Sequence, residues 1–437
     1  MKELTLAQIA EACGGTLIGG NEAKEYTVTG VEIDSRRVKA GDLFVAIPGE
    51  KVDGHKFIPD VLKKGAYALS QQSLDVDGAY ILVEDTVTAM KRLARFYRST
   101  LDIKVVGITG SVGKTSTKEM IASVLGTKFR VHKTQGNFNN GIGLPLTIFQ
   151  IEKEHQVAVL EMGISEFGEM HELADMAQPD IMVITNIGLC HLENLKTRDG
   201  ILKAKTESFA HLKPDGVVIL NGDDDKLSTV EQVAGRKPVF YGIKGRNLCE
   251  TSVCADAVTE HGLEGMTAEF HTPQGDMEVF IPIPGEHNVY NALAAVAVWS
   301  YFDLPKDRIC HALEHLYVNG RMEIVHTSKR CTVIVDYAHN AISMESLLKT
   351  LRDYHPKRLV CVFGCGGNRS KDRRYSMGEI GGRLADLSIL TADNSRYEKV
   401  EDIIADIRGS IEKTGGKFVE IPDRREAIRY SIVNAQP

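Results

Sequence analysis

The sequence lacks the long apolar segments of membrane and secreted proteins. No run approaches the roughly 20 apolar residues of a membrane-spanning helix, and residues 1–10 do not contain the apolar core of a signal peptide. These absences predict a cytoplasmic protein that does not enter a membrane. The net charge is −7, with both signs interspersed, so the sequence has no basic footprint for binding nucleic acid.

Cysteine is sparse, and no two cysteines form a CxxC pair. The eight cysteines are scattered through 437 residues, without histidines at zinc-ligand spacing beside them. This arrangement predicts reduced, mostly buried thiols and does not predict a zinc site. The composition, 43% hydrophobic and 25% charged, is typical of a globular chain, and its length allows about three domains.

The most informative segment is a glycine-rich turn between a predicted strand at residues 105–108 and a predicted helix. In this order, backbone N–H groups and the helix N-terminus face a phosphate, a lysine reaches the terminal phosphates and a hydroxyl binds Mg²⁺. The spacing departs from GxxxxGK[ST], which would require Gly where Ile108 stands, and a turn with a chance Lys-Thr is the alternative. The predicted phosphate-binding residues are Gly110, Gly113, Lys114, Thr115 and Ser116.

The chain divides into three predicted domains, residues 1–100, 101–318 and 319–437. In the second domain, short apolar runs alternate with helical or loop sequence, which predicts an α/β fold with a parallel sheet and helices on both faces. Residues 240–285 predict an antiparallel extension. The third domain is predicted to be doubly wound and Rossmann-like. Its last helix, predicted at 424–434, should lead into another strand, so we expect the chain to continue beyond Pro437.

Two residues that follow apolar runs of the second domain are candidate metal ligands, and a lysine in a helical stretch lies nearby in the sequence. Glu161 ends the run at 157–160, and the carboxyl ends of parallel strands face the ligand crevice, so Glu161 is expected to complete the Mg²⁺ shell begun by Thr115. His191 follows the run at 181–184, and Lys205 lies in a helical stretch. The alternatives are a capping Glu, a structural His and an ordinary solvated Lys.

Asparagines form two further candidate groups. The segment 136–145 contains Asn137, Asn139 and Asn140 among three glycines, which argues against a helix interior and suits a polar, phosphate-bearing substrate; an ordinary loop is the alternative. Asn288 precedes an Ala-rich helix and reads as an N-cap, whereas Asn291 is placed to contact a base edge.

Polar residues also follow the predicted strands of the third domain. Asp336 and His339 end one apolar run and are expected to contact ribose hydroxyls across a domain cleft. The segment 364–374 is glycine-rich and basic, and we interpret it as a second anion site. Arg396, which follows Asp393 and Asn394, is placed to bind a carboxylate with two hydrogen bonds.

Together these motifs resemble the Mur ligase superfamily, the ATP-dependent amide ligases that build the peptidoglycan stem peptide, over essentially the whole chain. The segments 34–36, 41–44 and 53–57 are similar to the uridine-nucleotide-binding first domain of the family. Residues 109–116 match its phosphate loop, including the departure from GxxxxGK[ST]. The resemblance therefore implies a three-domain architecture with a central P-loop domain and a Rossmann-like C-terminal domain.

The resemblance implies a reaction and a set of catalytic residues. ATP phosphorylates the carboxylate of a UDP-MurNAc-peptide, and the amine of an amino acid or dipeptide then attacks the acyl phosphate. Lys114, Lys205 and His191 are the implied catalytic residues. Thr115 and Glu161 would hold one Mg²⁺, and His191 would hold a second together with Lys205 carbamylated by CO₂.

The resemblance also implies nucleotide and substrate contacts in a monomer whose domains close on one another. Asn288 and Asn291 would border adenine, and Arg321 and Asp336 would close on the nucleotide. Arg396 would meet the carboxylate of the incoming residue. The implied substrate-binding residues are Ser35, Arg36, Asn137, Asn139, Asn140, His339, Asp393, Asn394 and Arg396.

Different segments resemble different members of the family. The segments 53–57 and 136–145 are similar to members that add D-Ala-D-Ala (MurF). The segments 336–340, 363–367 and 393–396 resemble members that add a diamino acid (MurE), with Ser395 in place of the usual Pro. We favour D-Ala-D-Ala addition to UDP-MurNAc-tripeptide. The alternatives are addition of meso-diaminopimelate or L-Lys to UDP-MurNAc-L-Ala-D-Glu, a folylpolyglutamate or cyanophycin synthetase, and a P-loop switch or partner-dependent subunit.

Overall fold

The computed structural model describes residues 4–49, 52–302 and 304–436. Residues 1–3 and Pro437, where the sequence predicts a continuing chain, lie outside the described residues. The contacts divide the chain into two compact units: unit 1 comprises residues 1–259, 267–281 and 286–316, and unit 2 comprises residues 260–266, 282–285 and 317–437. The division into three domains stays a prediction. Among the described residues, no helix is long and apolar enough to cross a membrane.

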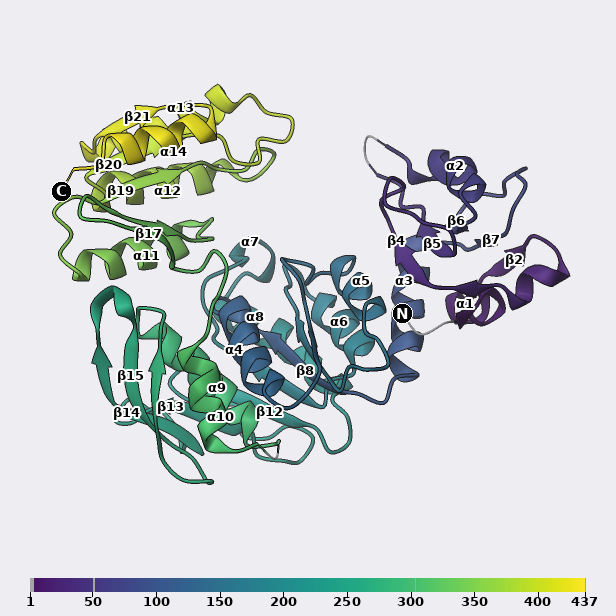
Figure 1. Ribbon diagram of the computed structural model, residues 1–437, viewed down its shortest axis with the longest axis horizontal. Coiled ribbons are helices and arrows are strands. Elements are labelled where there is room, and N and C mark those ends of the chain that lie inside the picture. The colour runs from purple at the N-terminus through teal and green to yellow at the C-terminus, as the bar shows by residue number, and fades with distance from the viewer. Residues whose placement is uncertain (1–3, 50–51, 303, 437) are drawn as a thin grey trace. The chain divides into compact units, whose positions relative to one another are not determined.

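A nine-stranded sheet forms the centre of unit 1 (Figure 1). Its strand order is β16-β15-β14-β13-β12-β11-β8-β10-β9, and the pairs from β9 to β14 are parallel. All four apolar runs predicted as strands of this domain are confirmed as members of this sheet. The strands are β8 (Lys104–Thr109), β9 (Val131–Lys133), β10 (Val157–Glu161), β11 (Ile181–Ile184), β12 (Val217–Asn221), β13 (Val239–Ile243), β14 (Val253–Glu260), β15 (Met266–His271) and β16 (Met277–Ile281).

Strand β8 lies where the order of the strands reverses. The chain leaves β8 for β9 and β10 on one side and then returns to β11 on the other. In an open parallel sheet, such a switch point leaves a crevice at the carboxyl ends of the strands, where ligands bind. The phosphate loop therefore emerges between the ends of β10 and β11.

Helices cover both faces of this sheet, as predicted. Alternate strand residues, among them Val105, Leu160 and Met182, join one hydrophobic cluster with side chains of α3 and α6. Helices α4 and α9 contact the same sheet and each other, and their side chains lie outside that cluster, so they cover the opposite face. The helices are α3 (Thr86–Ser99), α4 (Lys114–Gly126), α5 (Gly143–Phe149), α6 (Glu169–Ala177), α7 (Leu192–Leu195), α8 (Arg198–Thr206), α9 (His287–Trp299) and α10 (Lys306–Glu314).

The first hundred residues build a smaller sheet with the order β2-β7-β6-β5-β4. Helix α3 packs on α1 of this part and also on α5 and α6 of the central part, and its Arg95 pairs with Asp175 of α6 at 3.1 Å. The elements are α1 (Leu6–Cys13), β2 (Thr16–Ile18), β4 (Gly30–Glu32), β5 (Asp42–Val45), α2 (Ile58–Lys63), β6 (Tyr67–Ser70) and β7 (Tyr80–Leu82), with β1 (Leu4–Thr5) paired to β3 (Thr27–Val28).

Unit 2 contains the parallel sheet β19-β20-β21, the antiparallel pair β17-β18 and four helices. Helices α12 and α13 pack together and bury Met377, Ile403 and Ile407 with the apolar side of the sheet. The elements are β17 (Glu323–Thr327), β18 (Thr332–Val335), α11 (Ala341–Asp353), β19 (Val360–Phe363), α12 (Lys371–Leu384), β20 (Leu387–Leu390), α13 (Val400–Thr414), β21 (Phe418–Glu420) and α14 (Arg424–Val433).

Five sequence expectations are wrong in detail. The extension predicted to be antiparallel at 240–285 begins as a parallel one, since β13 pairs in parallel with both β12 and β14. Helix α12 begins at Lys371, inside the segment 364–374 that was interpreted as an anion site, and α5 begins inside the segment 136–145, at Gly143. Asn288 is not an N-cap, because α9 begins one residue before it. The thiols are free, but only Cys13 and Cys365 are buried, and the other six are partly exposed.

Candidate active site

The phosphate loop connects β8 to α4 through two glycines with positive φ. Gly110 has φ 154° and Gly113 has φ 82°. A Cβ at Gly110 would lie 1.9 Å from Thr185 Oγ1, and one at Gly113 would lie 2.7 Å from Asn291 Oδ1, so side chains are excluded at both positions. The Lys114 ammonium donates to the Gly110 carbonyl oxygen at 2.9 Å, which holds it over the loop at the N-terminus of α4.

A segment after β11 fixes this loop, and sequence reasoning missed it. The Asn186 amide oxygen accepts from the N–H of Val112 at 3.0 Å, and the Thr185 hydroxyl donates to the Val112 carbonyl at 2.6 Å. The N–H of Gly188 donates to Ser111 Oγ at 2.8 Å. The only available signal was the position of Thr185 and Asn186 directly after an apolar strand.

Three polar side chains meet at the end of β10. Thr115 Oγ1 donates to Glu161 Oε2 at 3.1 Å, and Asn139 Nδ2 donates to Glu161 Oε1 at 2.8 Å. Glu161 is only 2% exposed, and a buried carboxylate requires such partners. Cis oxygen ligands of an octahedral Mg²⁺ with bonds of 2.0–2.1 Å are about 3 Å apart, so the spacing of Thr115 and Glu161 fits one Mg²⁺.

A buried lysine that sequence reasoning missed lies beneath this group. Lys118, one turn after Lys114 on α4, donates to the Thr134 carbonyl at 2.7 Å and lies 3.0 Å from Glu119. Its ammonium is 4.0 Å from Glu161 Oε2. The positive charge therefore compensates buried carboxylates, a condition for keeping ionised groups away from water.

Lys205 and His191 form a second group beside the loop. Lys205 is buried, with its Nζ 3.4 Å from Thr109 Oγ1 at the end of β8. Burial and the nearby Lys114 ammonium lower the pKa of Lys205 to about 7. Burial, Lys205 and Lys114 also lower the pKa of His191, and His191 adopts φ 61° where α7 begins. At neutral pH this group offers a neutral imidazole and an amine with a substantial uncharged fraction.

Asn288 and Asn291 are buried on α9 against the phosphate-loop helix. Asn291 Nδ2 donates to Asn288 Oδ1 at 3.0 Å, and Asn291 Oδ1 accepts from the Thr117 hydroxyl at 3.1 Å. Asn291 therefore contacts the back of the loop at Gly113, and Ser116 is buried beside it. A contact of these amides with adenine stays a prediction.

The three asparagines of the segment 136–145 differ in their contacts and in their exposure to solvent. Asn140 Oδ1 accepts from the N–H of Gly143 at 2.8 Å, at the start of α5. Asn139 reaches Glu161, as described above, and its carbonyl accepts from the N–H of Gly163 at 2.8 Å. Asn137 is exposed. Asn140 is exposed as well, whereas Asn139 is half-buried.

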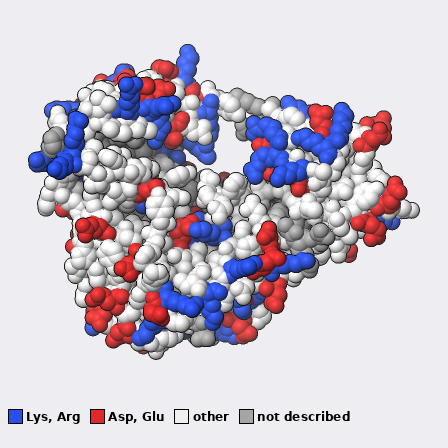
Figure 2. All heavy atoms as spheres, in the orientation of Figure 1, with Lys and Arg blue, Asp and Glu red and all other residues white. Residues whose placement is uncertain are grey.

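The predicted nucleotide-binding residues of the first hundred residues lie in an exposed, basic region. Arg36 binds Asp34 through two hydrogen bonds of 2.9 and 2.7 Å, and these bonds lower the pKa of Asp34 to about 2. The Ser35 carbonyl accepts from Lys64 at 2.9 Å. Figure 2 shows Lys and Arg gathered where β4 and α2 lie, which favours an anionic ligand here.

In unit 2, Arg321 and Asp336 lie on neighbouring turns. The Arg321 guanidinium stacks over the Tyr337 ring, 4.9 Å from its centroid, and Asp336 accepts from the N–H groups of Met322 and Ala338 at 2.9 and 2.7 Å. His339 is exposed, with its Nδ1 3.1 Å from the Tyr337 carbonyl. The structure thus brings these predicted residues together around Tyr337, an aromatic residue that was not predicted.

A second polar group of unit 2 forms where β19 and β20 end. Arg396 donates to the Gly367 carbonyl at 2.6 Å, and the N–H of Gly367 donates to the Asn394 carbonyl at 2.8 Å, whereas Asp393 is exposed. The predicted second anion site is incorrect at Arg374. This residue is buried in α12 and pairs with Glu398 at 2.7 Å and Asp406 at 2.9 Å, so its charge is already satisfied.

Comparisons with known proteins match this chain to one family along nearly its full length. Residues 27–98 match the catalytic domain of the Mur ligase family, residues 108–299 the Mur ligase middle domain, and residues 320–437 the Mur ligase glutamate ligase domain.

Two relatives and one solved structure illustrate the match. The UDP-N-acetylmuramoyl-tripeptide–D-alanyl-D-alanine ligase of Bacillus subtilis is 36% identical, covering 94% of each chain. The UDP-N-acetylmuramoyl-L-alanyl-D-glutamate–2,6-diaminopimelate ligase of Caldanaerobacter subterraneus is 34% identical, covering 94% of this chain and 87% of the relative. The structure of MurF ligase from Thermotoga maritima in complex with ADP superposes with a TM-score of 0.71 and 27% identity, covering 93% of this chain and 96% of that one.

Both the site and these matches therefore agree with the resemblance found in the sequence. The chain belongs to the Mur ligase family, the ATP-dependent ligases of peptidoglycan precursor synthesis.

Proposed function

We propose that this protein adds D-Ala-D-Ala to the terminal carboxylate of UDP-MurNAc-tripeptide, with ATP as the phosphoryl donor. One observation carries the proposal: Thr115 and Glu161, 3.1 Å apart, meet at a phosphate loop that also has a buried lysine at its edge. A nucleotide switch requires the loop and one metal, but it does not require Lys205 and His191 beside them.

The chain's own residues supply what phosphoryl transfer requires. Lys114 and the N-terminus of α4 would neutralise charge on the transferred group, and Mg²⁺ held by Thr115 and Glu161 would supply further electrostatic stabilisation. A carboxylate oxygen of the peptide attacks the γ-phosphorus, and the bond to ADP breaks. The amine of the dipeptide then attacks the acyl carbon, loses a proton and expels inorganic phosphate, which leaves an amide.

Lys205 is proposed to carry a carbamate. Reaction with CO₂ requires an uncharged amine, and the pKa of Lys205, lowered to about 7 by burial and the Lys114 charge, provides one at neutral pH. The product has a carboxylate-like end that would hold a second Mg²⁺ together with the neutral imidazole of His191. That ion would lie near the acceptor carboxylate.

The remaining predicted residues are assigned to substrate contacts. Ser35 and Arg36, which follow β4, would bind the uridine nucleotide. In unit 2, Arg321 and Asp336 would contact ATP, and Arg396 would bind the carboxylate of the dipeptide. We further propose that the protein acts as a monomer in the cytoplasm.

Addition of a diamino acid is the second candidate. The relative from Caldanaerobacter subterraneus, named as a diaminopimelate ligase, is nearly as similar as the Bacillus subtilis relative. The segment 393–396 also resembles that type, and Arg396 lies beside Gly367 in the same loop group. Unit 2 would then determine which amine is accepted.

Phosphate release from ATP tests both candidates. The protein is assayed with UDP-MurNAc-tripeptide plus D-Ala-D-Ala, and in parallel with UDP-MurNAc-dipeptide plus meso-diaminopimelate or L-Lys. Turnover with the first pair alone supports the proposal. Turnover with the second pair alone establishes a diamino-acid ligase, and no turnover with either pair would favour a partner-dependent subunit.

A further inference from the structure

A cluster of metal-ligating side chains lies on α10, apart from the catalytic residues. His311, Glu314 and His315 are exposed, and their ligand atoms lie within 4.8 Å of one another. Glu314 and His315 are three and four positions after His311, so both lie near His311 at the end of α10, where His315 caps the helix. The spacing of the cysteines did not predict a zinc site, but the ligands of this cluster are histidine and glutamate, so it does not require a cysteine.

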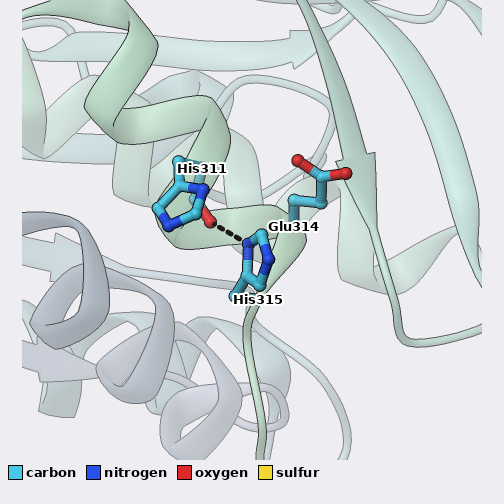
Figure 3. A group of neighbouring side chains, drawn as sticks. All are labelled: His311, Glu314 and His315. Atoms are coloured by element: carbon cyan, nitrogen blue, oxygen red, sulfur yellow. Dashed lines mark hydrogen bonds between the residues drawn. The ribbon is translucent and has the colours of Figure 1, made fainter.

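The two imidazoles are already arranged side by side. Their ring centroids are 4.1 Å apart, and His315 Nδ1 lies 2.9 Å from the His311 carbonyl oxygen (Figure 3). A carbonyl oxygen only accepts, so Nδ1 of His315 must carry the proton. This hydrogen bond leaves the lone pair on Nε2, and metal-ligating histidines are normally oriented by such a bond through their other ring nitrogen.

The charge around the cluster also favours a cation. Helix α10 ends at Glu314, and the unsatisfied carbonyl groups of a helix C-terminus carry partial negative charge. Glu314 adds a full negative charge, and it makes no salt bridge with a basic side chain in the described part of the chain. In Figure 3 its carboxylate is turned outward, but an exposed side chain can rotate toward the imidazoles.

Helix α10, which carries the cluster, is fixed by packing and hydrogen bonds to neighbouring elements. Ile309 and Leu313 are fully buried, and α10 packs on α4 and β16. Ser123 of α4 donates to the Ala312 carbonyl at 3.1 Å, and Arg308 donates to the Thr127 carbonyl at 3.1 Å. Binding an ion here therefore requires only side-chain rotation, which keeps the entropic penalty small.

We propose that His311, Glu314 and His315 form a binding site for a divalent transition-metal ion of the Zn²⁺ class, with water completing the coordination. Two imidazoles and one carboxylate suit Zn²⁺, Ni²⁺ and Cu²⁺. Mg²⁺ prefers oxygen ligands and retains its water, so this site is distinct in chemistry from the proposed catalytic Mg²⁺ sites.

Calorimetric titration of the metal-free, untagged full chain with Zn²⁺, in excess Mg²⁺, tests the proposal. We expect one Zn²⁺ per chain and tighter binding of Cu²⁺. Because loss of even an outer partner of a ligand weakens metal binding about 10-fold to 100-fold, H311A and H315A should each weaken it at least about tenfold. E314Q should weaken it less, because a neutral amide oxygen still coordinates.

Three control variants locate the ion. H326A removes an exposed imidazole elsewhere, and C310S removes the thiol next to His311; both should bind Zn²⁺ as the parent does. H171A breaks the other close histidine pair, in which His171 and His211 are 3.0 Å apart, and should also bind normally. Unchanged melting temperatures without metal would show that the variants fold. No Zn²⁺ binding by the parent, equal binding by H311A and H315A, or loss of binding in H171A or C310S would overturn the proposal.

Discussion

Replacing Gly113 by Ala tests the most constrained position of the phosphate loop. Gly113 has φ 82°, and a residue with a Cβ in this region costs about 1–2 kcal/mol. The new Cβ would lie 2.7 Å from Asn291 Oδ1, which must then move away from the Thr117 hydroxyl. A buried hydroxyl left without its partner costs about 1–3 kcal/mol.

The total expected loss for G113A is therefore about 2–5 kcal/mol of unfolding free energy. Because the backbone N–H groups of this loop are predicted to face the phosphates, we also expect ADP affinity to fall at least about tenfold, which corresponds to about 1.4 kcal/mol. Denaturant unfolding of the nucleotide-free protein measures the first quantity, and calorimetric titration with ADP measures the second.

Two further variants separate backbone strain from the contact with Asn291. G136A provides a matched control, since Gly136 has φ 53° and a Cβ added there would meet no atom of the described residues within 4 Å; it should show only the cost of strain. In an N291A background the obstructing oxygen is absent, so G113A should cost about 1–2 kcal/mol less than in the parent. An equal cost in both backgrounds, or unchanged stability and ADP affinity in G113A, would refute this reasoning.

Three other predictions follow from the same contacts. E161Q keeps the shape but removes the charge of the proposed Mg²⁺ ligand, so phosphate release should require at least about tenfold more Mg²⁺; an unchanged Mg²⁺ requirement would contradict the assignment. The pKa of Lys205 is lowered to about 7 in the folded protein, so between about pH 7 and the ordinary lysine value near 10.4 only the unfolded chain binds this proton, and folding stability rises with pH. The melting temperature of K205M should therefore lack this rise with pH. The same pH profile in K205M and the parent would argue against the buried amine. R374M should destabilise unit 2 by about 1–3 kcal/mol, because it removes the charged hydrogen bonds to the partly exposed Glu398 and Asp406. R373M should change the unfolding free energy by less than about 0.5 kcal/mol, and similar effects of the two variants would show that Arg374 is not the structural residue.

Local signals in the sequence were sufficient for the fold class and the phosphate loop. Apolar runs of strand length, separated by turn residues and helical periodicity, already specify a parallel α/β sheet. The loop was also readable, because Gly113, Lys114 and Thr115 are adjacent in the chain and their chemistry depends on local backbone geometry. The same local logic failed in the segment 364–374, where glycine and basic residues indicated an anion site, but Arg374 lies buried in α12 and pairs with two carboxylates.

Family resemblance supplied candidate residues whose partners the sequence could not identify. Glu161 and Asn139 are 22 residues apart, and Lys205 is 96 residues from Thr109, yet each pair lies within hydrogen-bonding distance. No local signal marked Lys118, Thr185 or Asn186 as residues of the site, because a lysine on a helix or a polar residue after a strand is usually solvent-exposed.

The sequence alone therefore determined the fold class, the phosphate loop and the family, since these depend on periodicity and on contiguous motifs. Only the tertiary structure decided which side chains share the site. The order of strands β10, β8 and β11 brings the ends of three distant segments together, and burial there fixes the charge partners of Glu161 and lowers the pKa of Lys205. Strand order and desolvation arise from long-range packing, which no local pattern in the chain records.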